Sequence, residues 1–325
     1  STRRINIIIN CPPNPTEEDV VRALERVGDL NPIQIIAIGG GSTIDLGKAI
    51  NALYYMFKDE KVTADMITEA LKTGSYQKPH QFIDIIAIPS TAGTGSEVTR
   101  FASFWGASEK AKYSIMTEHN YPKKAIIIPE LTLTLPQRVA FSTGIDALSH
   151  AIEAFWSRSA TYLEKDIAIR AIDLIMDYLP KTLADPQNLE LRTGMLRGAL
   201  LAGIAFSKPG CTACHSIGYA LTMHYGVEHG LACALTLDAV ARINREKTVL
   251  ADMLFERFEK YGGLQNWLDS TSKGIVEMRL SYFGIPKEGI DELVKDTFTY
   301  GKFTMDNNPV NISEEQVREI LLSIF

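Results

Sequence analysis

The sequence predicts two domains of different class: an α/β domain with a parallel sheet over residues 1–135, and an all-α domain over residues 136–325. In the first part, short β-branched runs alternate with helical patterns, which is typical of parallel strands joined by right-handed crossovers. In the second part, helical patterns follow one another and strand signals nearly vanish. The stretch from Pro129 to Pro136 is the natural boundary between the two.

Composition sets the class of protein. The 325 residues are 46% hydrophobic and 22% charged, as in ordinary globular proteins of this length. The balance of 33 basic and 39 acidic residues gives a net charge of −6, which argues against nucleic acid or an anionic membrane as partner. No apolar run is long enough to span a membrane, and no signal peptide is visible. Because a few cysteines in so long a chain do not suggest a disulfide framework, we expect a cytoplasmic protein. The cysteines are Cys11, Cys211, Cys214 and Cys233.

The first elements are a strand and a capped helix. The β-branched run Ile5–Ile9 predicts a strand. Thr16 then precedes three acidic residues, the pattern of a helix N-cap with acids in the first turn. Apolar residues at helical spacing follow at Val20, Val21, Leu24 and Val27.

Two buried strands come next. Ile33–Ile38 is almost wholly apolar, as expected of a strand covered on both faces, and a helix is predicted from about residue 43 to 56. Ile83–Ile88 is a second strand of the same type. A doubly wound domain normally places a further strand and helix before such a glycine turn, so we expect that first unit to be absent from this chain.

The second domain is predicted to consist of helices alone. Its helical patterns cover residues 143–157, 161–180, 189–206, 212–224, 229–244, 247–261, 275–283 and 287–299.

A glycine turn joins the first buried strand to its helix. Gly39, Gly40, Gly41 and Ser42 permit close approach of a ligand, and the helix N-terminus beyond them favours phosphate. Asp45, in the first helical turn, is a candidate to cap the helix or to bind a ribose. The turn is neither GxGxxG nor a Walker A motif, because Lys48 lacks the required spacing. A tight turn without a ligand is the alternative.

A second polar turn follows the next strand. Its hydroxyl and glycine residues, including Thr91, Thr94 and Ser96, form a plausible anion cradle. The alternative is an ordinary helix start capped by Ser96 or Thr94. Because ligands of open α/β sheets bind at the carboxyl ends of strands, two such turns at successive strand ends favour a nucleotide.

Histidines and one aspartate form the second candidate site. Asp146 and His150 are spaced i and i+4, which places them on one helix face. With His215 and His229 they would offer three nitrogens and one oxygen, a set that suits Zn²⁺ or Fe²⁺ rather than Ca²⁺ or Mg²⁺. The spacing alone leaves open an ion pair and separate helix-capping histidines.

The segment from Cys211 to His215 matches the CxxCH pattern of c-type haem attachment. A non-catalytic haem or metal-binding protein is therefore a competing hypothesis. Without a visible export signal, we expect Cys211 and Cys214 to be small buried residues in helix packing instead.

Four blocks in sequence resemble the iron-dependent (group III) alcohol dehydrogenase superfamily, and the resemblance covers essentially the whole chain. The blocks are Ile35–Lys48 (IIAIGGGSTIDLGK), Ile88–Glu97 (IPSTAGTGSE), Thr143–Glu153 (TGIDALSHAIE) and His215–Gly230, with Glu130–Pro136 (ELTLTLP) between the domains. The resemblance implies a dehydroquinate synthase-like architecture: a dinucleotide-binding α/β domain, a helical metal-binding domain, and an active site in the cleft between them.

The resemblance also implies roles for single residues. Matching positions give a pyrophosphate turn at Gly39, Gly40, Gly41, Ser42 and Asp45. They give a second nucleotide loop at Thr91, Thr94 and Ser96, and a lysine near the cofactor ribose at Lys112. They give metal ligands at Asp146, His150, His215 and His229.

The chain departs from the family pattern in two places. The opening strand and helix, which commonly carry the choice between NAD and NADP, are not in this sequence. Where most members have a histidine assigned to proton relay, this chain has Tyr219. The alternative interpretation is that Tyr219 only packs in its helix. The sequence around Tyr219 is similar to that of a sub-branch of the family with phosphonoacetaldehyde reductases and certain sugar-acid oxidases. This similarity implies a polar or anionic substrate.

The function that follows is hydride transfer between NAD(P)H and an aldehyde or primary alcohol, with Fe²⁺ or Zn²⁺ as Lewis acid. Tyr219 or His224 is the candidate for moving the proton, although His224 is also interpretable as a substrate contact or a surface helix residue. The alternative function is a dehydroquinate synthase-like lyase, which also uses NAD and a metal. The resemblance further implies a homodimer or larger homo-oligomer.

Overall fold

The computed structural model describes residues 10–78, 80–106 and 112–325. The chain divides into two compact units. The first comprises residues 1–90 and 96–128, and the second comprises residues 91–95 and 129–325. We call them the nucleotide unit and the helical unit. The second unit therefore begins at Pro129, at the start of the stretch in which the sequence places the boundary, and it takes five residues from within the first.

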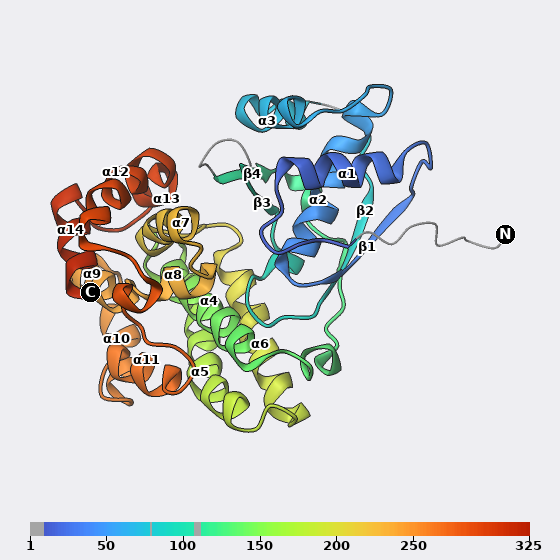
Figure 1. The fold of residues 1–325 in the computed structure, drawn as a ribbon. Coiled ribbons are helices and arrows are strands. Elements are labelled where there is room, and N and C mark those ends of the chain that lie inside the picture. The colour runs from blue at the N-terminus through green and yellow to red at the C-terminus, as the bar shows by residue number, and fades with distance from the viewer. Residues whose placement is uncertain (1–9, 79, 107–111) are drawn as a thin grey trace. The chain divides into compact units, whose positions relative to one another are not determined.

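The nucleotide unit is built on a small parallel sheet (Figure 1). Strand β1 (Gln34–Gly39) pairs with β2 (Asp84–Pro89), which pairs with the short β5 (Lys124–Ala125). Both predicted apolar strands are confirmed, and they pair in parallel register with Ile36 opposite Ile86. The predicted strand Ile5–Ile9 lies outside the described residues.

Three helices accompany this sheet. α1 (Glu17–Val27) starts at Thr16, whose hydroxyl accepts a hydrogen bond from the backbone N–H of Asp19, as the sequence predicts. α2 (Gly41–Phe57) packs on β1, and Gly47 allows the close approach because a Cβ there would lie 3.3 Å from Ala37 and Ile35 side chains. α3 (Ala64–Thr73), capped by Thr63, was not predicted.

The expectation that β1 is covered on both faces is wrong for the described residues. Ile35 and Ala37 face α2, but Ile36 and Ile38 on the opposite side of the strand are 53% and 56% exposed. Side-chain exposure alternates along β1 because α2 contacts only one face of the strand. An apolar run thus identified the strand correctly and its environment incorrectly.

An antiparallel hairpin completes the unit. β3 (Phe101–Trp105) pairs with β4 (Lys112–Met116), and it buries Ala102 and Phe104 against the helices. The sequence analysis did not predict this pair, because each strand has only five residues and a weak alternation.

The helical unit follows the predicted class. In Figure 1 its helices α4, α5 and α6 lie side by side, and they contact one another extensively. The helices that match predicted patterns are α4 (Gln137–Trp156), α5 (Tyr162–Ala184), α6 (Leu189–Phe206), α7 (Ala213–Tyr225), α10 (Ala251–Glu259) and α12 (Ile290–Tyr300). The helices without a predicted counterpart are α11 (Leu264–Ser272), α13 (Lys302–Asp306) and α14 (Glu314–Ser323).

Two predicted helices differ from the structure. The predicted helix 229–244 is divided into α8 (His229–Ala234) and α9 (Leu237–Asn244), where the hydroxyl of Thr236 donates to the carbonyl of Cys233. The predicted helix 275–283 is wrong. Val276, Met278 and Leu280 are buried while the residues between them are exposed, so this segment has a period of two and only a 3₁₀ turn at Leu280–Phe283.

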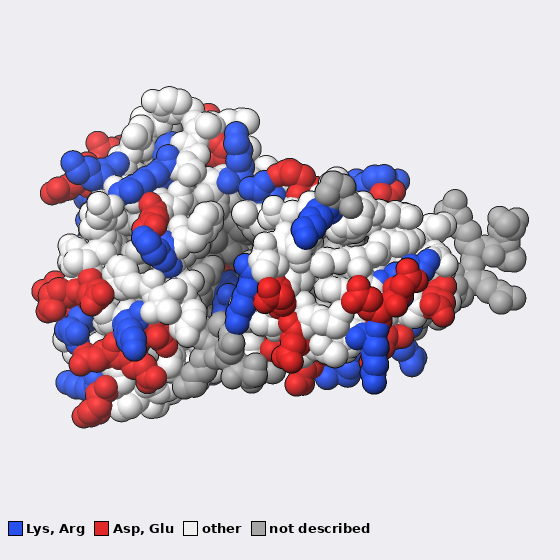
Figure 2. All heavy atoms as spheres, turned by 90° about the horizontal axis from the view of Figure 1, so that it is seen from above, with Lys and Arg blue, Asp and Glu red and all other residues white. Residues whose placement is uncertain are grey.

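No helix in the part of the chain that the structure describes is long and apolar enough to cross a membrane. Figure 2 shows one face of the molecule, on which acidic and basic side chains are interspersed rather than gathered by sign.

Candidate functional site

Helix α4 carries the first two residues of the predicted metal site. Asp146 and His150 are both buried on one face of this helix, with His150 Nδ1 3.9 Å from Asp146 Oδ2. This distance is too long for a hydrogen bond. The pair is therefore close without being a hydrogen-bonded ion pair.

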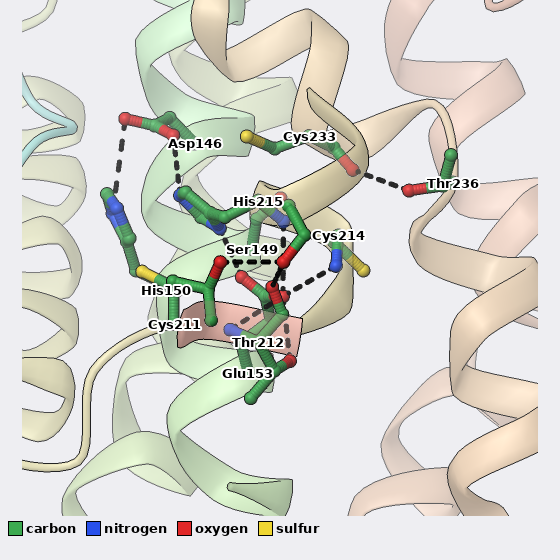
Figure 3. Close-up of polar contacts among 12 residues, drawn as sticks. Asp146, Ser149, His150, Glu153, Cys211, Thr212, Cys214, His215, Cys233 and Thr236 are labelled. Carbon is green, nitrogen blue, oxygen red and sulfur yellow. Dashed lines mark hydrogen bonds and ion pairs between the residues drawn. The ribbon is translucent and has the colours of Figure 1, made fainter. Parts of the chain in front are cut away.

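Helix α7 brings His215 to the same carboxylate (Figure 3), and helix α8 brings His229 to it. His215 Nε2 lies 3.7 Å from Asp146 Oδ1, and His229 Nε2 lies 4.0 Å from the same oxygen. The structure thus places all four predicted ligands around Asp146, from three helices that are separated in the sequence.

Close helix packing makes this convergence possible. Gly230, next to His229, faces α4 so closely that a Cβ would lie 2.0 Å from the carbonyl oxygen of Ser142 and 2.8 Å from Asp146 Cβ. Only glycine fits there without moving α8 away from α4.

Glu153 is a functional residue to which the sequence analysis gave no role. It is fully buried on α4, and one oxygen accepts hydrogen bonds from Thr212 and from the backbone N–H of Cys214. Its other oxygen is hydrogen-bonded to His215 Nδ1, which leaves Nε2 directed at Asp146. Burial raises the pKa of Glu153 to about 7, against the lowering effect of these hydrogen bonds. The sequence could have indicated Glu153 as part of this site, because it lies seven residues after Asp146 on the same helix face.

His150 is held by ring stacking. Its ring lies parallel to that of Phe206, with centroids 4.0 Å apart, and stacks on His215 at 4.7 Å. Its Nδ1 atom is buried and has no hydrogen-bond partner among the described residues. A buried nitrogen of this kind calls for a partner such as a cation.

These observations fit a divalent cation. Ligand atoms about 2.1 Å from a tetrahedral ion lie about 3.4 Å apart, which is close to the separations of 3.7–4.0 Å around Asp146. Imidazole nitrogens and a carboxylate are the donors that Fe²⁺ and Zn²⁺ accept. Asp146, His215 and His229 each offer an atom within 4.8 Å of the other two, and His150 adjoins this group through Asp146 and His215, so the donor set and its burial suit such an ion.

Tyr219 lies beside this cluster. Its ring stacks on His229, with centroids 5.8 Å apart, and meets the edge of His215 at 6.2 Å. Burial is the largest cause that raises the pKa of Tyr219 well above its usual range. The phenol therefore keeps its proton at neutral pH in this environment.

His224 lies elsewhere on α7. Its Nε2 atom is 2.6 Å from Asp296 Oδ2, and its Nδ1 atom is 3.8 Å from a carboxylate oxygen of Glu292, both on α12. His224 is nine residues from His215, roughly 13 Å along the helix axis. The structure does not bring His224 into the Asp146 cluster, and its part in proton transfer stays a prediction.

The CxxCH cysteines have separate environments. Cys214 is fully buried, as expected, while Cys211 is only half-buried. The sulfur of Cys211 lies within 4.8 Å of ring nitrogens of His150 and His215. Cys211 lies in the loop before α7, so the expectation of a buried residue in helix packing holds for Cys214 but not for Cys211.

In the nucleotide unit, the two strands that lead into the predicted turns end side by side. Gly39 and Pro89 are paired residues of β1 and β2, and the backbone N–H of Ser90 donates to the carbonyl of Gly39. A Cβ at Gly39 would lie 2.5 Å from Thr43 Oγ1, so the turn requires glycine. Gly40 is the N-cap of α2 and has no side chain to cover the helix end, which suits an anion.

The second turn is held by glycines. A Cβ on Gly93 would lie 2.6 Å from the carbonyl oxygen of Thr143, and one on Gly95, whose φ is +61°, would lie 2.5 Å from Gly203 Cα. Thr91 and Thr94 are half-buried on this loop. Ser96 begins a 3₁₀ turn (Ser96–Val98) rather than an α-helix.

Asp45 and Ser96 belong to a buried network centred on Lys48. The Lys48 ammonium donates to Ser96 Oγ at 2.8 Å, to Thr99 Oγ1 at 3.3 Å and to the carbonyl of Phe101 at 2.7 Å. Ser96 donates to Asp45 at 2.6 Å. Burial lowers the pKa of Lys48 to about 8 and raises that of Asp45. The network ties α2 to the second turn.

Lys112 begins β4, and its ammonium lies 6.0 Å from the centre of the Trp105 ring across the hairpin. This places it on the hairpin of the nucleotide unit. Its predicted contact with a cofactor ribose stays a prediction.

Comparison with known proteins identifies the family. Residues 140–325 match the C-terminal model of the Fe-containing alcohol dehydrogenase family, and residues 2–129 match the model for iron-containing alcohol dehydrogenase. The chain belongs to the iron-containing alcohol dehydrogenase family. It is an oxidoreductase that interconverts alcohols and aldehydes with NAD or NADP and a divalent metal, as the sequence analysis predicted.

Individual relatives show the range of this family. The NAD-dependent methanol dehydrogenase of Bacillus methanolicus is 29% identical over 90% of this chain and 78% of its own. The NADPH-dependent butanol dehydrogenase of Clostridium saccharobutylicum is 31% identical over 84% of this chain and 67% of its own. A crystal structure of sulfoacetaldehyde reductase from Bifidobacterium kashiwanohense in complex with NAD⁺ is 31% identical, with a TM-score of 0.85 over 97% of this chain and 82% of that one.

Proposed function

We propose that this dehydrogenase holds one divalent cation through Asp146, His150, His215 and His229. The observation that supports the proposal is the convergence of three histidines, on three separate helices, on the Asp146 carboxylate. A cation bound there would supply a Lewis acid for an aldehyde or alkoxide oxygen. The hydride chemistry belongs to the nicotinamide cofactor.

The residues around the ligands orient them. Glu153 accepts from His215 Nδ1 and so fixes the tautomer that directs Nε2 at the cation. Tyr219, stacked on His229, is our candidate for moving a proton to or from the substrate oxygen. His224 is the second candidate from the sequence, but its hydrogen bond to Asp296 favours a structural role.

In the nucleotide unit, we propose that the turn Gly39–Ser42 receives the cofactor pyrophosphate at the N-terminus of α2. The contacts of Thr91 and Thr94 with a nucleotide, and of Lys112 with its ribose, stay predictions from the family resemblance. Because the oxygens of Asp45 accept from Ser96 and from the backbone N–H of Ser103, Asp45 and Ser96 would act mainly by holding the two turns together.

For the substrate, we propose a small aldehyde that carries an anionic group, such as a sulfonate or phosphonate. The support is the likeness to the structure of sulfoacetaldehyde reductase and the sequence around Tyr219. A panel of sulfoacetaldehyde, phosphonoacetaldehyde, sugar aldehydes and propanal, assayed with NADH and NADPH after loading with Fe²⁺ or Zn²⁺, tests this. A preference for propanal over every anionic aldehyde would contradict it.

His229→Ala tests the metal site. We expect the variant to lose both bound metal and NAD(P)H oxidation, while His119→Ala, an exposed histidine of the nucleotide unit, keeps both. Turnover that persists in metal-free His229→Ala would refute the proposal. The same assay separates a dehydrogenase from a lyase, because a lyase recycles its cofactor and shows no net NAD(P)H consumption.

Tyr219→Phe and His224→Ala distinguish the two proton-transfer candidates. Loss of the Tyr219 hydroxyl is expected to lower kcat and alter its pH profile at unchanged metal content, whereas His224→Ala should alter stability more than the pH profile. The homodimer or larger assembly that the resemblance implies also remains a proposal, which light scattering on the purified chain tests.

A further inference from the structure

We propose that Cys233 supplies a thiolate as a fifth ligand, beside Asp146, His150, His215 and His229, to the cation proposed above, which makes this centre a site for thiophilic metals. The inference rests on the proposed metal site and adds a ligand that the family resemblance does not include. It concerns which cations the site retains.

The geometry already places the sulfur among the ligand atoms. One ligand atom each from Asp146, His215, His229 and Cys233 lies within 4.8 Å of all the others. Cys233 Sγ is 3.9 Å from His229 Nδ1 and 4.0 Å from Nε2. Sulfur and nitrogen in the trigonal plane of one five-coordinate Zn²⁺ lie about 3.8 Å apart, so a small movement would bring both onto one ion.

Local structure directs the sulfur inward. Cys233 follows His229 by four residues on α8, so both project from the same side of this helix. Figure 3 shows its sulfur pointing toward Asp146. Gly218 on α7 leaves room for it, because a Cβ at that position would lie 2.9 Å from Cys233 Sγ.

Two other cysteines nearby provide a comparison. Cys211 groups with His150 and His215 but with no carboxylate, and the sulfur of Cys214 points away from the cluster in Figure 3. Among the cysteines that the structure describes, only Cys233 belongs to the same group of possible metal ligands as Asp146. A thiolate and a carboxylate together neutralise a divalent cation, which lowers the cost of holding it in a buried site.

The chemistry predicts selectivity. On binding, the S–H bond of Cys233 breaks, a sulfur–metal bond forms, and the proton passes to water. Thiolate with imidazole favours Zn²⁺, Co²⁺ and Cd²⁺, whereas Mn²⁺ and Mg²⁺ prefer oxygen. Cys233 would therefore strengthen binding of the first group and leave the second almost unaffected.

Cobalt substitution of the full-length chain tests the proposal without using activity. We expect the wild type to bind one Co²⁺ per chain and to show a near-ultraviolet thiolate-to-cobalt charge-transfer band. Cys233→Ser should keep the cobalt and its weak visible bands but lose the charge-transfer band, while Cys211→Ser and Cys214→Ser retain it. In competition titrations, Cys233→Ser should weaken Zn²⁺ binding by about 10-fold or more and Mn²⁺ binding by less than about 3-fold.

Each other outcome overturns the inference. Cobalt bound to the wild type without a thiolate band would refute Cys233 as a ligand but leave the proposed metal site standing. A band that persists in Cys233→Ser, or that disappears in Cys211→Ser, would assign the thiolate to another cysteine. Failure of the folded wild type to bind any cobalt would overturn the metal site itself, and this inference with it.

Discussion

The buried charges of the two units are satisfied in different ways. In the nucleotide unit, Lys48 donates to three acceptors at 2.7–3.3 Å, and Asp45 accepts from Ser96 at 2.6 Å. In the helical unit, the groups around Asp146 stand 3.7–4.0 Å from it. The first network closes with the protein's own hydrogen bonds, whereas the second has the spacing of groups that share an ion. Hydrogen-bond distance therefore distinguishes the Lys48 network, which holds the fold, from the Asp146 group, which we propose binds an ion.

The largest expected effect is at Asp146, because every other predicted ligand faces its carboxylate. Asp146→Ala should remove bound metal and lower turnover on the order of 10³-fold or more, since a Lewis acid contributes several kcal/mol to such a reaction. Metal analysis and NAD(P)H oxidation check this. Asp177→Ala, which removes an exposed carboxylate paired with Lys181, is the control and should change neither. Normal metal content in Asp146→Ala would contradict the proposal that the Asp146 group binds an ion and the Lys48 network does not.

Lys48→Met should act on stability instead. The substitution leaves Asp45 and Glu97 buried without their cation, and breaking such a pair typically costs about 3–5 kcal/mol. Hydrogen exchange of the α2 backbone amides should therefore become faster. We expect the metal content of the helical unit to remain at the wild-type level. Loss of metal in this variant would show that the two networks are coupled.

Glu153→Gln sharpens the comparison within the helical unit. Gln keeps one acceptor oxygen but loses the negative charge and the second acceptor, and disturbing such a hydrogen bond to a ligand typically weakens metal binding about 10–100-fold. Competition with a chelator measures the loss. Since Gln is similar in size, circular dichroism should stay unchanged. Affinity equal to that of the wild type would mean that His215 needs no such support.

Gly230→Ala tests the close contact between α8 and α4. The added methyl group overlaps Ser142, which should cost about 1–3 kcal/mol and weaken metal binding by moving His229. Gly226→Ala is a suitable contrast, because its φ of +64° strains the backbone but no atom lies within 4 Å of the new Cβ. It should lower stability while leaving metal affinity intact. Equal metal affinity in both variants would count against the packing argument.

The smallest effect is a pH dependence. Because the pKa of Lys48 is lowered to about 8 in the folded protein, the unfolded chain holds this proton to higher pH, and stability rises as pH increases above 8. Between pH 8 and pH 9, the free energy of unfolding of the wild type should increase by about 1 kcal/mol more than that of Lys48→Met. Denaturation of both proteins at these two pH values measures the difference. Equal changes in the two proteins would mean that Lys48 keeps its proton over this range.

The sequence predicted most of what depends on local pattern. Thr16 and its acidic neighbours identified the start of α1, and the apolar runs located β1 and β2. Asp146, His150, His215 and His229 were predicted from residue type and from the family resemblance, because spacing alone left their convergence open. Local signals were enough for α1, β1 and β2, because caps and apolar runs are encoded within a few residues.

What the sequence missed depends on tertiary contacts. The exposure of Ile36 follows from α2 covering only one face of β1. The role of Glu153 depends on α7 placing His215 Nδ1 against it, and the position of Cys233 depends on the gap at Gly218. The predicted helix 275–283 failed because Val276 and its alternate neighbours are buried by long-range packing with a period of two.

Residues 91–95 leave the nucleotide unit and pack within the helical unit, where Gly95 lies against Gly203. A chain cut between residues 128 and 129 would therefore not yield two intact pieces, since the C-terminal fragment would lack five residues of its own interior. If either half is produced alone, or if halves are exchanged between homologous enzymes, residues 91–95 must therefore be kept together with the helical unit.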